Sequence, residues 1–70
     1  MVAITETSTK TWLDARDEAG RLVAMIHHAA ARHWWVHRID RSGSGGMVDG
    51  GRTLCRSMRA ARELIEGWLQ

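Results

Sequence analysis

The stretch Trp34-Trp35-Val36-His37-Arg38-Ile39-Asp40 decides the fold of this chain. Aromatic and β-branched side chains pack well on a pleated surface, and a Trp-Trp-Val run has poor helix propensity. We therefore expect a strand over residues 33–40. The connections before and after this stretch then determine how many strands join it.

Side chains on a strand alternate between its two faces. Placing the charged Arg38 and Asp40 in water predicts that Trp35 and Ile39 face the core. Trp34, Val36 and Arg38 are then expected on the open side of the sheet. Three indoles are expected to anchor the core between sheet and helix: Trp12, Trp35 and Trp68.

The residues before this strand indicate two more strands. Residues 10–17 and 21–28 have strand-like patterns, and Asp17-Glu18-Ala19-Gly20 is typical of a tight turn in which Gly20 adopts positive φ. Residues 29–32 are expected to turn into the third strand, over residues 33–40, and residues 53–55 could add a short fourth edge. The sequence therefore predicts an antiparallel sheet of three strands, or of four if residues 53–55 join it.

A helix is expected over residues 57–69. Ser57 is a good N-cap residue. After it, apolar residues recur at helical spacing: Met58, Ala61, Leu64, Ile65 and Trp68. A sheet covered on one face by this helix is a two-layer α+β domain.

A two-helix hairpin is the alternative. Residues 12–30 also show apolar side chains three to four apart, and no proline interrupts them. However, Gly20 in the middle of a helix would cost about 1 kcal/mol relative to alanine, and a helix of some thirty residues is unusually long for so small a domain. We therefore prefer the sheet.

The 70 residues allow one small domain, with 44% hydrophobic and 26% charged residues. Residues 1–9 and the glycine-rich residues 41–51 are expected to be flexible. No apolar run approaches the ~20 residues of a membrane helix, and no signal peptide is visible. A single cysteine, Cys55, indicates a reducing, cytoplasmic setting. A chain of this length has no room for a deep catalytic cleft, so we expect neither an enzyme nor a cofactor.

The charge is uneven along the chain. Residues 21–62 hold eight arginines against two aspartates, although the whole chain has a formal charge of only +2. Such a block favours a polyanionic partner, DNA or RNA, although arginine bias in a GC-rich coding sequence would give the same count. The expected nucleic-acid-binding residues surround the open sheet face: Arg21, Trp34, Arg38, Arg41, Arg52 and Arg56.

The strands and the Ala-rich helix carry a resemblance. Trp34-Trp35-Val36-His37-Arg38-Ile39-Asp40 followed by Ser57-Met58-Arg59-Ala60-Ala61-Arg62-Glu63 resembles the integrase-type and ethylene-response-factor-type DNA-binding domain, over roughly residues 21–69. In that family the sheet enters the DNA groove. The resemblance implies that Trp34 and Arg38 read the DNA.

Two further patterns bear on function. The histidines His27, His28, His33 and His37 lack a Cys-x-x-Cys or His-Glu-x-x-His context, so we expect structural or surface histidines and no metal site. An exposed tryptophan is also typical of protein interfaces. The sequence thus favours a small accessory or regulatory nucleic-acid-binding domain of bacterial or phage origin. The alternative is a module that binds a host protein or a homodimerising inhibitor, with no membrane partner.

Overall fold

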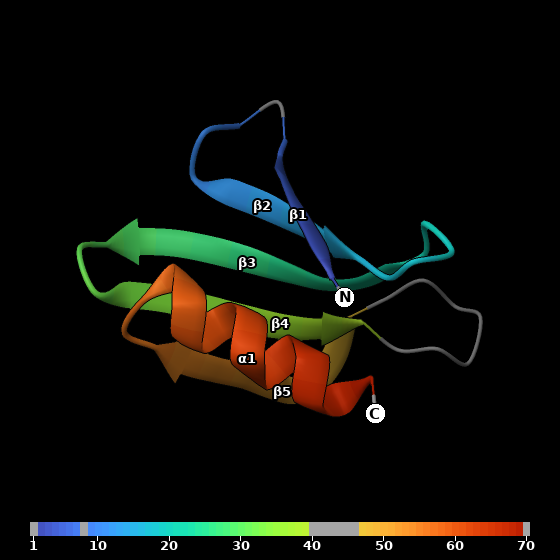
Figure 1. Cartoon of the computed structure of the whole chain (residues 1–70). Helices are drawn as coiled ribbons and strands as arrows, with labels where there is room; N and C mark the ends of the chain where they lie inside the picture. Colours follow the sequence, from blue (N-terminus) through green and yellow to red (C-terminus); the bar gives the residue numbers. More distant parts are fainter. Residues whose placement is uncertain (1, 8, 40–46, 70) are drawn as a thin grey trace.

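A five-stranded antiparallel sheet and one helix make up the fold. The computed structural model describes residues 2–7, 9–39 and 47–69, with only the backbone described for residues 47–50. The elements are β1 (Ala3–Glu6), β2 (Trp12–Arg16), β3 (Leu22–Ala30), β4 (His33–Ile39), β5 (Met47–Cys55) and α1 (Met58–Trp68). Each strand pairs with the next in the chain, in the order β1-β2-β3-β4-β5. The helix lies across one face of the sheet, over β3, β4 and β5 (Figure 1).

The α+β class is confirmed, and a two-helix hairpin is not supported. The strand count is higher than predicted. Ala3–Glu6 forms β1, within residues 1–9 where no element was expected, and β5 begins at Met47 rather than at residue 53. Neither strand has a strong pattern of its own: β1 is four residues long and β5 contains two glycines. Their ladders to β2 and β4 hold them in the sheet.

The predicted turn after β2 is confirmed. Gly20 has φ 83°, and its amide donates to the Asp17 carbonyl at 3.0 Å. The Asp17 carboxylate accepts from the backbone amides of Ala19 (2.9 Å) and Arg21 (3.0 Å). The hydrogen bond from the Arg21 amide, helped by the Arg21 charge, lowers the pKa of Asp17. This turn fixes the register between β2 and β3.

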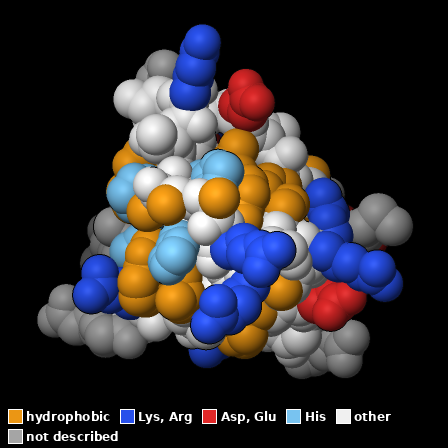
Figure 2. Space-filling model, turned by 90° about the vertical axis from the view of Figure 1, so that its left-hand side faces the viewer, with side chains coloured by type: hydrophobic (Ala, Val, Ile, Leu, Met, Phe, Trp, Pro, Cys, Tyr) orange, Lys and Arg blue, Asp and Glu red, His pale blue; other side chains and the backbone are white. Residues whose placement is uncertain are grey.

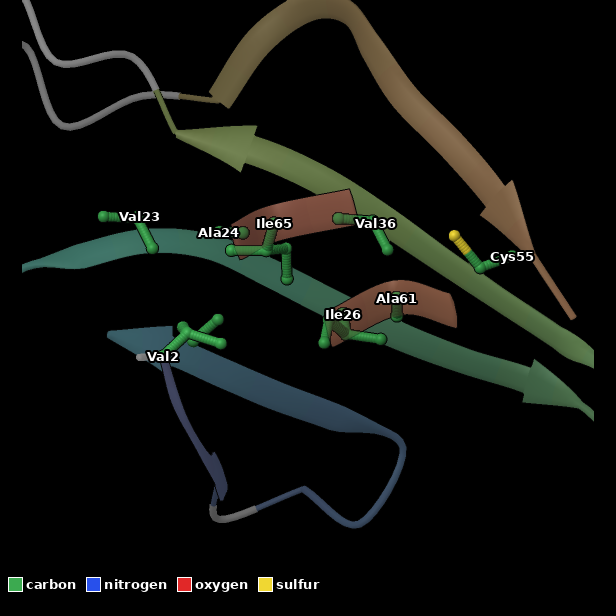
Figure 3. Packing of buried hydrophobic residues seen from close by; sticks show 9 residues of the cluster. Val2, Val23, Ala24, Ile26, Val36, Cys55, Ala61 and Ile65 are labelled. Atoms are coloured by element: carbon green, nitrogen blue, oxygen red, sulfur yellow. The ribbon is translucent and has the colours of Figure 1, made fainter. Parts of the chain in front are cut away.

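The core lies between the helix and the strands beneath it (Figure 3). Ile26, Val36 and Ile65 are completely buried, and Ile26 and Val36 are cross-strand partners. The helix begins as predicted, because the Ser57 hydroxyl accepts from the Ala60 amide at 3.1 Å. Small and branched side chains of the sheet and the helix therefore meet with no polar group among the described buried side chains.

A hydrogen bond connects the N-terminal segment to the helix. Arg62 of α1 donates from Nη1 to the carbonyl of Val2 at 2.6 Å, and Val2 is itself buried. A charged donor makes such a hydrogen bond stronger than a neutral one. The contact joins residues 60 positions apart in sequence.

The predicted faces of β4 were wrong. Val36 is in the core beneath the helix, and Trp34 packs against that core from the same face. Trp35 and Trp12, expected in the core, instead lie on the face away from the helix. Ile39 is buried as expected, at 8% exposure, but follows a register shift. The error came from Arg38: it is exposed although it shares the helix-side face, because the helix ends beside it.

Candidate functional site

The five predicted nucleic-acid-binding residues that the structure describes lie on different parts of the molecule. Arg21 and Arg38 lie toward the end of the sheet where β3 begins and β4 ends, and Arg56 lies at the opposite end, between β5 and α1. Arg41 lies outside the described residues. Arg21 is 75% exposed and pairs with Asp17, Nε to Oδ2, at 3.0 Å. The predicted set is therefore divided between two ends.

Trp34 and Arg38, the two residues expected to read DNA, both pack against other side chains on the helix side of the sheet. The half-buried Trp34 ring stacks on His28 at 3.6 Å between centroids, with planes 3° apart. The Arg38 guanidinium lies over the Trp68 ring of α1, 5.2 Å from its centroid. Trp34 and Arg38 share a face, as predicted, but it is the face that carries the helix.

Three connecting segments meet at the end of the sheet where β3 ends. These are the connection before β2 (residues 9–11), the β3–β4 turn (residues 29–33) and the start of α1 with the residues before it (residues 55–60). The Thr11 carbonyl accepts from the His28 amide at 2.8 Å, which holds the first segment against β3. Trp34 pairs with Cys55 across β4 and β5, which brings the third segment alongside.

These three segments carry basic side chains and no Asp or Glu. We call their exposed basic residues the basic end: Lys10, Arg32, His33, Arg56 and Arg59. Figure 2 shows Lys, Arg and His side chains spread over this part of the molecule among hydrophobic ones, with acidic side chains toward the margin of the view. The other end of the sheet mixes both signs, with Arg16, Asp17 and Arg21 close together.

The backbone contributes to the positive potential of the basic end. The N-terminus of α1 lies there, its first turn contains no acidic residue, and a helix N-terminus carries about half a positive charge. Arg59 is 3.3 Å from Glu63, Nε to Oε1, with both side chains largely exposed. Exposed pairs of this kind contribute little, so the Arg59 guanidinium can exchange Glu63 for another anion.

Arg32 has an unusual backbone conformation at the tip of the β3–β4 hairpin. Arg32 has φ 63°, the only positive φ among the described non-glycine residues. This conformation costs an ordinary L-residue roughly 1–2 kcal/mol, and it lets a two-residue turn connect β3 to β4. The turn holds the Arg32 guanidinium at the tip of the hairpin.

The face away from the helix is a second candidate surface, which we call the open face. Cross-strand partners on it form two rows. The first row is Trp12, His27, Trp35 and Leu54, and the second is Thr5, Asp14, Met25, His37 and Arg52. Leu54 is 39% exposed and is the most exposed large hydrophobic residue among those described. Across residues 2–7, 9–39 and 47–69, no element covers this face (Figure 1).

Ring contacts and one cation–π contact join the side chains of the open face. Trp12 stacks on His27 at 4.5 Å between centroids and lies 5.3 Å from His37. The Arg52 guanidinium lies over Trp35, 4.7 Å from the ring centroid. Arg52 was predicted at the nucleic-acid site with Trp34, but its aromatic neighbour is Trp35.

His37 is held in its neutral form on this face. Burial against its neighbours, then the charges of Arg52 and His27, lowers the pKa of His37. An ordinary histidine has a pKa of about 6.5. The lowered pKa keeps His37 uncharged near neutral pH.

The lowered pKa of His37 predicts acid sensitivity. The unfolded chain binds a proton at His37 more tightly than the folded chain does. The stability that neutral His37 contributes is therefore present above pH ~6.5, and it is lost as the pH falls through that value toward the lower folded pKa. Urea unfolding of dilute protein between pH 5 and 8 should show a shallower pH dependence for His37→Gln than for the wild type. Equal slopes in the two proteins would contradict the assignment.

Cys55 and the histidines are the remaining residue types of chemical interest. Cys55 is a free, buried thiol whose pKa is raised by burial, which opposes the thiolate that a nucleophile needs. Within the described part of the chain, no three His, Cys, Asp or Glu side chains come close enough to hold a metal ion. No helix there has the length and apolar character to cross a membrane.

Comparisons with known proteins identify no relative of this chain. No family model, curated protein or solved structure matches this chain. The two candidate surfaces therefore rest on the fold and its side chains alone.

Sequence reasoning missed Lys10, Arg32 and Arg59. A usable signal was present. In an antiparallel meander, alternate turns lie at the same end of the sheet, so the predicted turn at residues 29–32 and the start of the predicted helix belong together. Counting charge by sheet end, rather than by block of sequence, would have selected these residues.

Proposed function

We propose that this protein binds nucleic acid through the basic end, by contacts to the phosphate backbone. The observation that carries the proposal is the meeting of three connecting segments that together present Lys10, Arg32, Arg56 and Arg59. The acidic residues beside them are Glu6, at the end of β1, and Glu63, which pairs with Arg59. Phosphate contacts from Lys and Arg supply most of non-specific nucleic-acid affinity. The helix N-terminus adds backbone N–H groups suited to the same anion.

The basic end favours backbone contact over base reading. Its cations come from turns and from the first helical turn, and their long side chains are exposed. Trp34, the residue that follows His33 of the basic end, is stacked on His28 and packed on the core. Trp34 therefore supports the β3–β4 hairpin that carries Arg32. We expect weak dependence on base sequence.

The dependence of affinity on salt tests this function. For duplex DNA, log K falls with log[salt] with a slope of about −0.9 per phosphate neutralised. Three or four cations predict a slope of about −2.7 to −3.6. Fluorescence anisotropy with a labelled 20-base-pair duplex, from ~50 to ~300 mM salt, measures this slope, and single-stranded DNA of equal length gives a parallel series.

Two outcomes would overturn the proposal. One is the absence of detectable binding to either DNA at ~50 mM salt, where phosphate contacts are strong. The other is binding whose slope is shallower than about −1, since contacts to several phosphates require a steeper one.

A further inference from the structure

We propose that the open face binds the open face of a second copy of this chain, around a two-fold axis parallel to the strands and between β3 and β4. This inference uses a different surface from the basic end and does not depend on nucleic-acid binding. A 70-residue chain has a thin core on one side of its sheet only. Packing two such sheets face to face would give each a second apolar layer.

The register of the sheet makes the open face self-complementary. A two-fold axis in this position sets β3 opposite β4 of the second copy, and β2 opposite β5. Each cross-strand row of one copy then lies opposite the same row of the second copy. In the row of Asp14, Met25, His37 and Arg52, Asp14 then faces Arg52 of the second copy, and the symmetry forms this pair twice.

The aromatic row is matched by the same operation. Trp12 faces Leu54 of the second copy, and His27 faces Trp35. Large rings therefore meet a branched or aromatic side chain, and no charge meets a like charge across the axis. Aromatic residues and Arg are the groups that dominate binding energy at interfaces.

The charged pair lies within reach despite the twist of the sheets. Packed sheets cross at about 30°, and Asp14 and Arg52 are each one and a half strand spacings, about 7 Å, from the axis. The crossing displaces such positions by about 3–4 Å, which an arginine side chain can span. Among the residues that the structure describes, the ion pair of Asp14 within the monomer is a longer one, from Oδ2 to Nη2 of Arg16 at 3.5 Å.

The dimer would double the proposed nucleic-acid surface. An axis parallel to the strands leaves both basic ends on the same side of the dimer. Packed sheets lie about 10 Å apart, so the two sets of cations would form one continuous surface. Dimerisation itself is measured without nucleic acid, so either proposal can fail alone.

The test uses charge reversal in two separate chains. Asp14→Arg places two arginines opposite each other across the interface, and Arg52→Asp places two aspartates opposite each other. We expect the wild type to dimerise reversibly in sedimentation velocity from ~10 µM to ~1 mM, and each variant to raise the dimer Kd at least about tenfold.

Mixing the two variants in equal amounts should restore dimerisation. In the mixed dimer, the arginine introduced in one variant faces the aspartate introduced in the other. The native Arg52 of the first variant likewise faces the native Asp14 of the second. Both positions of the symmetric pair then hold opposite charges again.

Restoration by mixing separates this interface from damage to the fold. Asp14 and Arg52 lie on β2 and β5, with two strands between them, so they do not pair with each other within one chain. Leu54→Arg, at an exposed site, is a second variant expected to be monomeric. The proposal is overturned if the wild type is monomeric at ~1 mM. It is also overturned if folded variants, checked by circular dichroism, dimerise like the wild type, or if the mixture stays monomeric.

Discussion

Ile26→Ala is expected to remove a large fraction of the protein's stability at 25 °C. Ile26 is completely buried at the centre of β3, between its partners Leu13 and Val36 and beneath α1. Truncating such a residue removes about 2–5 kcal/mol of stability. A 70-residue domain has roughly 3.5–10 kcal/mol in total. The loss is therefore a large fraction of the whole.

Urea denaturation followed by circular dichroism measures this effect. Ile26→Val removes one methylene group and serves as the matched control, with an expected loss of about 0.5–1.5 kcal/mol. The ratio between the two losses in free energy of unfolding is more informative than either loss alone, because both substitutions are at the same site. A loss below about 1 kcal/mol for Ile26→Ala would mean that β3 is not at the centre of the core.

Neutralising two cations of the basic end should sharply reduce DNA affinity. We expect the double variant Arg32→Gly, Arg56→Gln to bind duplex DNA about 10- to 100-fold more weakly at ~50 mM salt, with a salt slope smaller by about two. Glycine accepts the positive φ of residue 32 without steric cost. Loss of folding therefore does not explain a loss of binding in this variant.

The double variant Arg21→Gln, Arg38→Gln is the control. It removes the same charge from two residues that the sequence pattern placed in the site and that lie toward the other end of the sheet. Its salt slope should stay within experimental error of the wild-type slope. If it loses as much affinity as the basic-end variant, binding depends on net charge alone and the proposed surface is wrong.

The sequence predicted those elements whose signal is local. The helix has an N-cap serine, an apolar stripe and polar residues opposite it, and it was found within one residue at each end. The Asp17–Gly20 turn was found because only glycine adopts positive φ cheaply. By contrast, β1 and the first half of β5 are short or glycine-rich, and their partners on β2 and β4 hold them in place.

The choice of face on β4 required the tertiary structure. Alternation along a strand says which side chains share a face, and Trp34, Val36 and Arg38 do share one. It does not say which face the helix covers. The charge of Arg38 was a misleading guide, since α1 ends beside Arg38 and leaves the guanidinium to lie over Trp68 in contact with water.

The sequence by itself determined the α+β class, the helix and its cap, the turn at Gly20 and the excess of arginine in residues 21–62. Each follows from interactions between residues near one another in the chain. The packing of α1 alone decided that Val36 is in the core and Trp35 on the open face. Strand order alone brought Lys10, Arg32 and Arg56 to one end, because side chains far apart in sequence become neighbours only when backbone pairing fixes the direction of every strand.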